Sequence, residues 1–259
     1  MSKLNSTLIA SLLASAAFAA SPALADGTDF SGLLGGDYAH LSADHGFGDA
    51  NVWGVTGSGV VNFGTPGLAA EGDAGYQNFS GNGSSNLWNV DGSLFWRMPE
   101  GRIGGVIGYD SASNGGGHTT NYGGFGEWFA GSSFTLGAKG GGFNASFHSD
   151  GYYAGGNLTG YVIPDFALSG GIDYTHFNHF TNETDWNLRA EYLLSERVPV
   201  SIWGGYTNSN LSNGGPDINA FLVGVNLYFN GNGGTSLVDR QRDGAARWGT
   251  SFAPIGITF

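Results

Sequence analysis

The stretch 218–229 alternates strictly between two kinds of side chain, and this period of two is the feature that most constrains the fold. One set is wholly apolar and comprises Phe221, Val223, Val225, Leu227 and Phe229. The other set is small or mixed and comprises Ala220, Leu222, Gly224, Asn226 and Tyr228. Successive side chains of a β-strand point to opposite faces of the sheet, so this stretch is predicted to be a strand with one apolar face. A single strand is not stable alone, so similar strands are expected elsewhere in the chain.

The same alternation recurs along the chain. The clearest earlier segments are 186–194 and 88–98, and the weakest is 30–41. The glycine run 140–142 blurs the alternation, and we expect a β-bulge there. Eleven strands are predicted before 218–229, which makes twelve in total: 30–41, 52–63, 68–79, 88–98, 102–110, 121–130, 134–139, 152–162, 168–175, 186–194 and 200–207.

The predicted connections alternate between short and long. Short turns rich in Gly or Pro are expected at 64–67, 99–101, 164–165 and 195–199. Long polar loops are expected at 111–119, 177–184 and 208–217. This rhythm is typical of outer-membrane β-barrels, where an even strand count returns both termini to the periplasm.

Composition and the N-terminus narrow the class of protein. The formal net charge of −12 argues against nucleic-acid binding, and the absence of Cys removes thiolate metal sites and Cys nucleophiles. An apolar run from Leu8 to Ala20 precedes Ala23-Leu24-Ala25, the pattern of a signal-peptidase site. Residues 1–25 are therefore predicted to be a cleaved secretory signal peptide. No cofactor is expected.

A soluble β-sandwich or lipocalin-like barrel would also contain alternating strands, with the charged face turned to solvent. The leader, the 48 glycines and the rhythm of the turns favour an all-β, antiparallel transmembrane β-barrel of twelve strands over residues 26–229.

These ordered features resemble the outer-membrane β-barrel and porin-like proteins of Gram-negative bacteria. The specific pieces are the leader and the strand ending Leu227-Tyr228-Phe229. The resemblance implies residence in the cell outer membrane, contact with outer-membrane lipid, and folding by the barrel assembly machinery with Leu227 and Phe229 as assembly signal. It implies no single function, because the family includes passive pores, adhesins, structural proteins and a few lipid-modifying enzymes.

Family members usually stop at the terminal Phe, but this chain continues for residues 230–259 and ends in Phe259, a rival for the assembly signal. In one interpretation 251–259 is the true last strand, although Pro254 would remove a ladder hydrogen bond. In the preferred interpretation 230–259 is a mobile periplasmic tail. A third is that the tail docks in the mouth of the lumen, its arginines against Asp or Glu, and gates flow.

The polar faces of the strands carry charged side chains that a barrel would turn into its lumen. The predicted lumen-facing set is Asp91, Arg97, Glu127, Lys139, Asp173, Arg189 and Glu191. Charges in a narrow lumen must be paired or hydrated, and an acidic balance predicts a small pore that prefers cations among small solutes or ions. The alternative is that these charges only brace a filled, structural barrel.

Two other functions stay open from the sequence. Ser146 and His148 share a strand face, which is compatible with a lipid-acting hydrolase, but no third orienting group is evident. The long loops would suit a surface-binding or adhesive barrel. The six His residues show no spacing typical of a metal site. The oligomeric state does not follow from the sequence.

Overall fold

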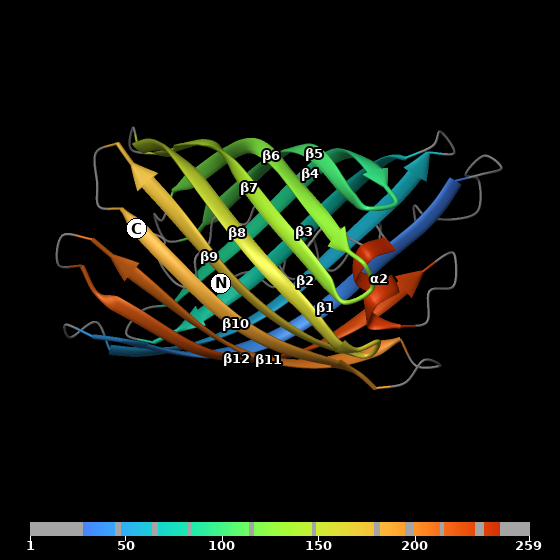
Figure 1. Cartoon of the computed structure of the whole chain (residues 1–259). Coiled ribbons are helices and arrows are strands. Elements are labelled where there is room, and N and C mark those ends of the chain that lie inside the picture. The colour runs from blue at the N-terminus through green and yellow to red at the C-terminus, as the bar shows by residue number, and fades with distance from the viewer. Residues whose placement is uncertain are drawn as a thin grey trace, which may run out of the picture.

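The computed structural model is a single closed barrel of twelve antiparallel strands with one short helix at one end (Figure 1). It describes residues 28–44, 48–63, 67–81, 84–113, 117–146, 149–178, 182–194, 199–212, 215–230 and 236–243. The elements are β1 Thr28–Ala43, β2 Gly48–Phe63, β3 Leu68–Ser80, β4 Ser85–Met98, β5 Gly101–Ala112, β6 His118–Ala130, β7 Phe134–Ala145, β8 Ser149–Ile163, β9 Phe166–Phe177, β10 Glu183–Leu193, β11 Val200–Leu211, β12 Asp217–Asn230 and α2 Leu237–Asp243.

The predicted fold class and the count of twelve strands are confirmed. Each strand pairs with its neighbours in sequence, and β12 pairs with β1 from Ser31↔Asn230 to Ala43↔Ile218, which closes the ring. The stretch 218–229 therefore forms the closing strand. The rival last strand, 251–259 with Phe259, lies outside the described residues, as does the predicted signal peptide 1–25.

The two faces of each strand are oriented as the alternation predicted. The outer surface is apolar and includes exposed side chains such as Trp88, Leu94, Leu188, Phe221 and Val223. Because every backbone group of a closed barrel is paired to a neighbouring strand, such a barrel can expose an apolar outer face to lipid without unpaired polar groups. Among the described residues, no helix is long and apolar enough to cross a membrane.

The predicted bulge at the glycine run is wrong. Residues 140–142 stay in continuous register with both β6 and β8, and the register shift lies instead between Tyr161 and Ile163 of β8. Gly141 has a packing role, because a Cβ there would overlap the backbone of Tyr122 and lie 2.7 Å from the hydroxyl of Tyr153. The glycine run therefore makes room for an inward tyrosine without breaking the ladder.

The long loops are shorter than predicted. The strands continue into the expected loops, so the connections shrink from 111–119, 177–184 and 208–217 to 113–117, 178–182 and 212–216. Strands such as β1 and β2, of 16 residues each, exceed the roughly 9–11 residues that cross a bilayer. We call the end of the barrel that carries the connections 113–117, 178–182 and 212–216 the loop end. The opposite end, which carries Thr28, Asn230 and α2, is the helix end.

The helix α2 was not predicted, although its local sequence contains a start signal. Ser236 and Asp239 form a capping box: the Ser236 hydroxyl accepts from the Asp239 backbone N–H at 3.2 Å, and the Asp239 carboxylate accepts from the Ser236 backbone N–H at 3.3 Å. Arg240 and Arg242 in the last turn complement the helix dipole. A helix of seven residues is too short to persist alone in water, so its packing against the barrel must stabilise it.

Candidate functional site: the barrel lumen

The charged residues predicted from the sequence all lie on inner faces of the strands, and the structure brings most of them into pairs. Arg102 contacts Glu127, Lys139 contacts Asp173, and Arg189 contacts Glu191. Further acids share this inner wall, namely Asp37, Glu71, Asp73, Asp110, Glu183 and Asp185. The lumen is therefore lined by many carboxylates and few bases.

The ion pair between Arg102 and Glu127 is the most buried in the described structure. Nε of Arg102 donates to Oε2 of Glu127 at 2.6 Å across β5 and β6, and neither side chain is more than 4% exposed. The Arg102 guanidinium also lies 5.7 Å from the ring centroid of Phe95. Phe95 belongs to a buried apolar cluster with Val60, Ala69 and Phe125, so this part of the lumen is filled by side chains.

A second ion pair spans a whole strand near the middle of the barrel. Nζ of Lys139 on β7 lies 3.1 Å from the carboxylate of Asp173 on β9, although β8 runs between them. The residue between them in register is Gly155, and a Cβ there would overlap the Asp173 carboxylate. The missing side chain of Gly155 thus opens the path that lets the two charges meet.

Two pairs of carboxylates face each other across neighbouring strands. Asp73 on β3 is the direct partner of Asp91 on β4, and Asp173 on β9 is the direct partner of Asp185 on β10. β4 and β10 stand six strands apart in the ring, so these pairs lie on opposite walls of the lumen. Paired carboxylates therefore lie on both sides of the lumen.

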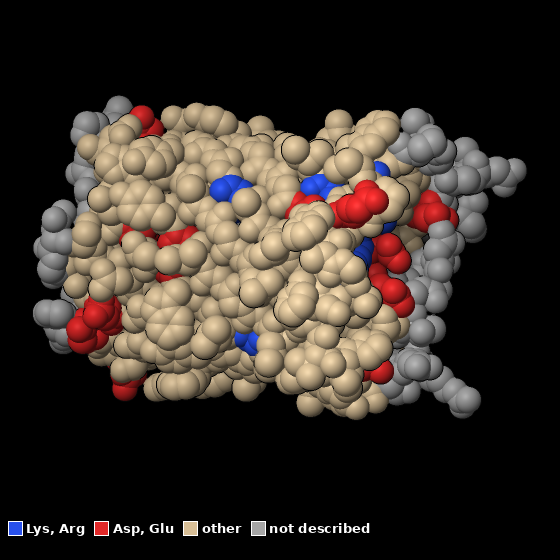
Figure 2. All heavy atoms as spheres, viewed as in Figure 1, with Lys and Arg blue, Asp and Glu red and all other residues tan. Residues whose placement is uncertain are grey.

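Charge is distributed unevenly along the barrel axis. In the described parts of the strands, the segments on the loop-end side of Lys139 and Arg189 contain no Lys or Arg. They do contain acids, among them Asp110, Glu183 and Asp185. On the face drawn in Figure 2, acidic atoms lie at both ends of the barrel, whereas basic atoms lie only toward the middle and the helix end. In the described strands, the loop-end part of the inner wall therefore carries acids without a base beside them in sequence.

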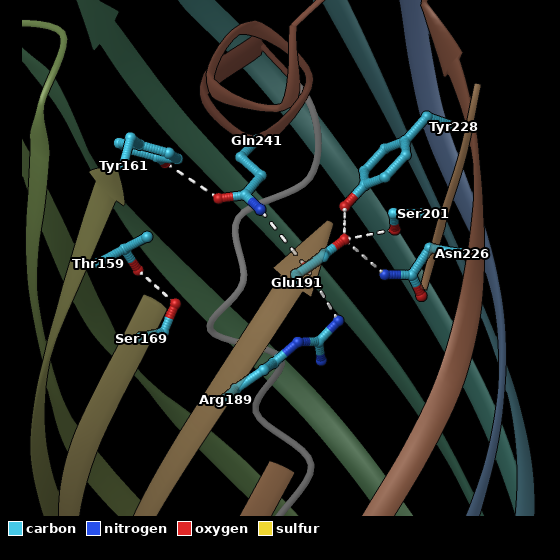
Figure 3. Close-up of polar contacts among 9 residues, drawn as sticks. All are labelled: Thr159, Tyr161, Ser169, Arg189, Glu191, Ser201, Asn226, Tyr228 and Gln241. Carbon is cyan, nitrogen blue, oxygen red and sulfur yellow. Dashed lines mark hydrogen bonds and ion pairs between the residues drawn. The ribbon is translucent and has the colours of Figure 1, made fainter. Parts of the chain in front are cut away.

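Glu191 is the centre of a hydrogen-bond network near the helix end (Figure 3). Its side chain is 1% exposed, and one oxygen, Oε1, accepts from three donors on the next two strands. Those donors are the hydroxyl of Ser201 at 2.6 Å, Nδ2 of Asn226 at 3.0 Å and the hydroxyl of Tyr228 at 2.6 Å. Oε2 accepts from Arg189 at 3.1 Å and from Gln241 of α2 at 3.4 Å. The carboxylate is thereby satisfied although it is removed from water.

The helix α2 is anchored to strands on several sides of the barrel. Gln241 accepts a hydrogen bond from Tyr161 on β8 at 3.0 Å, and Nε of Arg242 donates to Thr135 on β7 at 3.2 Å. Arg242 also donates to the backbone oxygens of Gly131 and Phe134 at 2.6 and 2.7 Å. Leu237 is fully buried among apolar residues of the inner wall, which include Ala167 and Leu193. The described part of the tail is thus docked against the barrel, in contrast to the preferred prediction of a mobile segment.

The last residue of α2 contacts the other side of the ring. The backbone oxygen of Asp243 accepts from Ser31 on β1 at 2.9 Å and from Arg97 on β4 at 3.1 Å. Burial raises the pKa of the Asp243 carboxyl above its ordinary value, while the nearby Arg97 acts in the opposite direction. The third interpretation from the sequence placed the tail in the mouth of the lumen with its arginines against Asp or Glu. The helix is docked, but Arg242 contacts a hydroxyl and two backbone carbonyl oxygens instead of carboxylates.

The described residues offer little for hydrolase or metal chemistry. The Ser146 hydroxyl accepts from the backbone N–H of His118 at 3.0 Å, and His148 lies outside the described residues. Among the described residues, no group of three or more His, Cys, Asp or Glu is arranged to hold a metal ion. Phe229, predicted as assembly signal, lies on the outer face of β12 opposite Gly32.

Comparison with known proteins finds similarity in structure but not in sequence. No protein-family model and no curated protein matches the chain. Among solved structures, the KdgM porin matches with a TM-score of 0.53 at 14% identity, covering 75% of this chain and 99% of that porin. The NanC porin matches with a TM-score of 0.55 at 12% identity, covering 74% of this chain and 98% of that porin. An outer membrane channel from Pseudomonas putida F1 matches with a TM-score of 0.55 at 11% identity, covering 78% of this chain and 95% of that channel. The chain has the fold of the outer-membrane porins and channels.

Proposed function

We propose that this outer-membrane barrel is a passive channel with a narrow lumen that prefers cations. The observation that carries the proposal is the excess of carboxylates along the inner wall, with Asp73–Asp91 and Asp173–Asp185 on opposite sides. Rings and walls of Asp or Glu are how cation channels select their ions. Since the chain termini of an even-stranded barrel lie at the periplasmic end, the acidic loop end faces outward and the helix end faces the periplasm.

The two basic residues at mid-height do not reverse the cation preference in this proposal. Lys139 is held by Asp173, and the guanidinium of Arg189 lies 3.9 Å from the ring centroid of Trp203 while it also contacts Glu191. Both bases are neutralised by acids of the wall. The remaining carboxylates therefore determine the sign of the field that a solute meets.

Reconstitution into a planar bilayer tests the proposal. With a KCl gradient across the membrane, a cation-preferring channel gives a reversal potential of the sign set by K⁺ movement. Replacing both Asp73 and Asp91 by Asn should move this potential toward zero. An anion-selective potential, or no conductance from a correctly folded barrel, would contradict the proposal.

A structural envelope role is the second candidate, and the filled helix-end half of the lumen favours it. The cluster of Val60, Ala69, Phe95 and Phe125 and the buried Arg102–Glu127 pair occupy space that an open pore would leave to water. This role predicts a folded barrel that conducts no ions in any variant.

Two partners follow from the same proposal. The apolar outer surface would contact outer-membrane lipid, and Leu227 with Phe229 would present the last strand to the barrel assembly machinery. Replacing Phe229 by Ala should then lower the amount of assembled barrel in cells, while purified protein refolds into detergent at the wild-type yield. Equal amounts of assembled wild-type and variant protein would reject the assembly role.

A further inference from the structure

We propose that α2 is a plug that closes the helix-end mouth of the barrel and opens it by leaving its binding site as a unit. We call this binding site the seat and define it as Ser31, Arg97, Thr135, Tyr161 and Glu191. The inference deepens the proposed channel function, because it supplies the element that controls access to the lumen.

The first argument is geometric, and it is visible in Figure 1, where α2 lies across one end of the barrel. Asp243 is bound by Ser31 on β1, whereas Arg242 is bound by Thr135 on β7. β1 and β7 lie six strands apart in a ring of twelve, so they are on opposite walls. A single short helix that contacts both walls must lie across the mouth.

The second argument concerns the kind of contact. The polar contacts to the seat come from Gln241, Arg242 and Asp243, whose backbone oxygen and carboxylate both contact Arg97, and apolar burial comes mainly from Leu237 and Val238. Figure 3 shows Gln241 reaching from α2 between Tyr161 and Glu191. Besides Gln241, Glu191 has four donors from the barrel wall, so this carboxylate of the seat does not depend on α2 for its hydrogen bonds.

The third argument concerns cooperativity. A helix of seven residues has no stable helical state apart from its packing. Undocking therefore unfolds α2, and its contacts are lost together. This makes the plug an all-or-none device with two states, docked and released.

Thiol labelling measures release directly, because the chain contains no Cys. In the full-length purified protein, Val238→Cys places a thiol at a position that is 8% exposed when α2 is docked. A bulky polar maleimide reacts with it only when α2 has left the seat. Adding Gln241→Ala and Arg242→Ala should raise the labelling rate by about tenfold or more, since buried groups react through the open population.

Three further proteins make this measurement decisive. Thr135→Val keeps side-chain size but removes an acceptor for Arg242, and should raise the Val238→Cys labelling rate in the same direction by a smaller factor. Lys139→Ala removes one positive charge away from the seat and should leave the rate unchanged. Glu100→Cys, an exposed position in the turn between β4 and β5, should label equally with and without the α2 substitutions, which shows that a change at position 238 does not come from the reagent itself.

Conductance separates the plug from the channel. A higher labelling rate together with a several-fold higher conductance of the Gln241→Ala, Arg242→Ala protein supports both proposals. A higher labelling rate with no conductance from either protein rejects the channel and leaves the plug standing. Conductance that is present and equal in both proteins, or labelling that the substitutions do not change, overturns the plug.

Discussion

The hydroxyl of Tyr228 on β12 donates a 2.6 Å hydrogen bond to Glu191 on β10 across the intervening strand β11. Ser201 on β11 donates to the same oxygen at 2.6 Å. One buried carboxylate thus joins three consecutive strands beside the seam where β12 closes on β1.

This relationship predicts that neutralising Glu191 destabilises the helix end of the barrel. Glu191→Gln removes the charge that strengthens these hydrogen bonds, and we expect a loss of roughly 3 kcal/mol in the free energy of unfolding. Tyr228→Phe removes one donor and should cost roughly 1–2 kcal/mol. Urea unfolding followed by tryptophan fluorescence measures both. Tyr192→Phe, on the outer face, is the matched control and should change little; equal losses for the two tyrosines would contradict the role of the network.

The buried pair of Arg102 and Glu127 should show strong coupling in a double-mutant cycle. Glu127→Leu leaves the Arg102 guanidinium buried beside Phe95 without its carboxylate, which should cost about 3–5 kcal/mol. The combined change Arg102→Met with Glu127→Leu should cost clearly less than the sum of the single changes, because it removes both desolvated charges. Strictly additive losses in the same unfolding measurement would show that the two residues act independently.

Gly155 should tolerate a methyl group poorly, and the chain offers a matched glycine. A Cβ at Gly155 would overlap the Asp173 carboxylate, so Gly155→Ala must separate Asp173 from Lys139. We expect this change to lower the free energy of unfolding by roughly 1–3 kcal/mol. A Cβ at Gly72 would meet nothing within 4 Å, and Gly72→Ala should stay within about 0.5 kcal/mol of wild type. Thermal unfolding of both variants decides the matter, and similar midpoints would refute the packing explanation.

Removal of Lys139 should increase the preference for cations if the protein is a channel. Lys139→Gln leaves Asp173 without its ion pair while it keeps a polar side chain there, so the wall becomes more negative at mid-height. We expect the reversal potential in a KCl gradient to move further in the K⁺ direction. Asp173→Asn should have the opposite effect. A shift of the same sign in both variants would mean that the pair does not contribute to selectivity through its charge.

A charge on the outer face should be costly in proportion to its depth in the bilayer. Leu188 lies in the middle of β10 and is 58% exposed on the apolar surface. Leu188→Arg should therefore lower the free energy of unfolding by about 2–4 kcal/mol. Leu194 directly follows the end of the same strand, and Leu194→Arg should cost about 0–1 kcal/mol. Unfolding from lipid bilayers is the appropriate measurement. Equal costs would imply that the apolar surface is not embedded in lipid.

The strands were predictable because their pattern is local. Alternation of side chains, as in 186–194, depends only on the geometry of the strand itself. Even the weak segment 30–41 proved to be a strand, since β1 pairs along its length with both β2 and β12. The bulge and the long loops were mispredicted for the opposite reason: whether 140–142 or 177–184 stays in a ladder depends on what the neighbouring strands can pair with.

The lumen was predictable only as a set of residues. The inward positions of Lys139 and Asp173 followed from alternation. Their contact across β8 requires the space left by Gly155, and the spacing of residues in the sequence does not indicate that Gly155 lies between them. The helix α2 had a detectable start signal in Ser236 and Asp239. Its position across the mouth depends on contacts to β1 and β7, which are far apart in the sequence and meet the helix only because the sheet is closed.

The sequence by itself therefore determined a twelve-stranded, two-faced sheet and the acidic character of its inner side, because both depend on the period of two and on charge. Only the tertiary structure decided which charges pair, where Glu191 collects its donors, and that α2 lies across one mouth. Those features arise from ring closure, which places strands that are distant in the chain on one lumen, where side chains must share a small space and satisfy one another's charges.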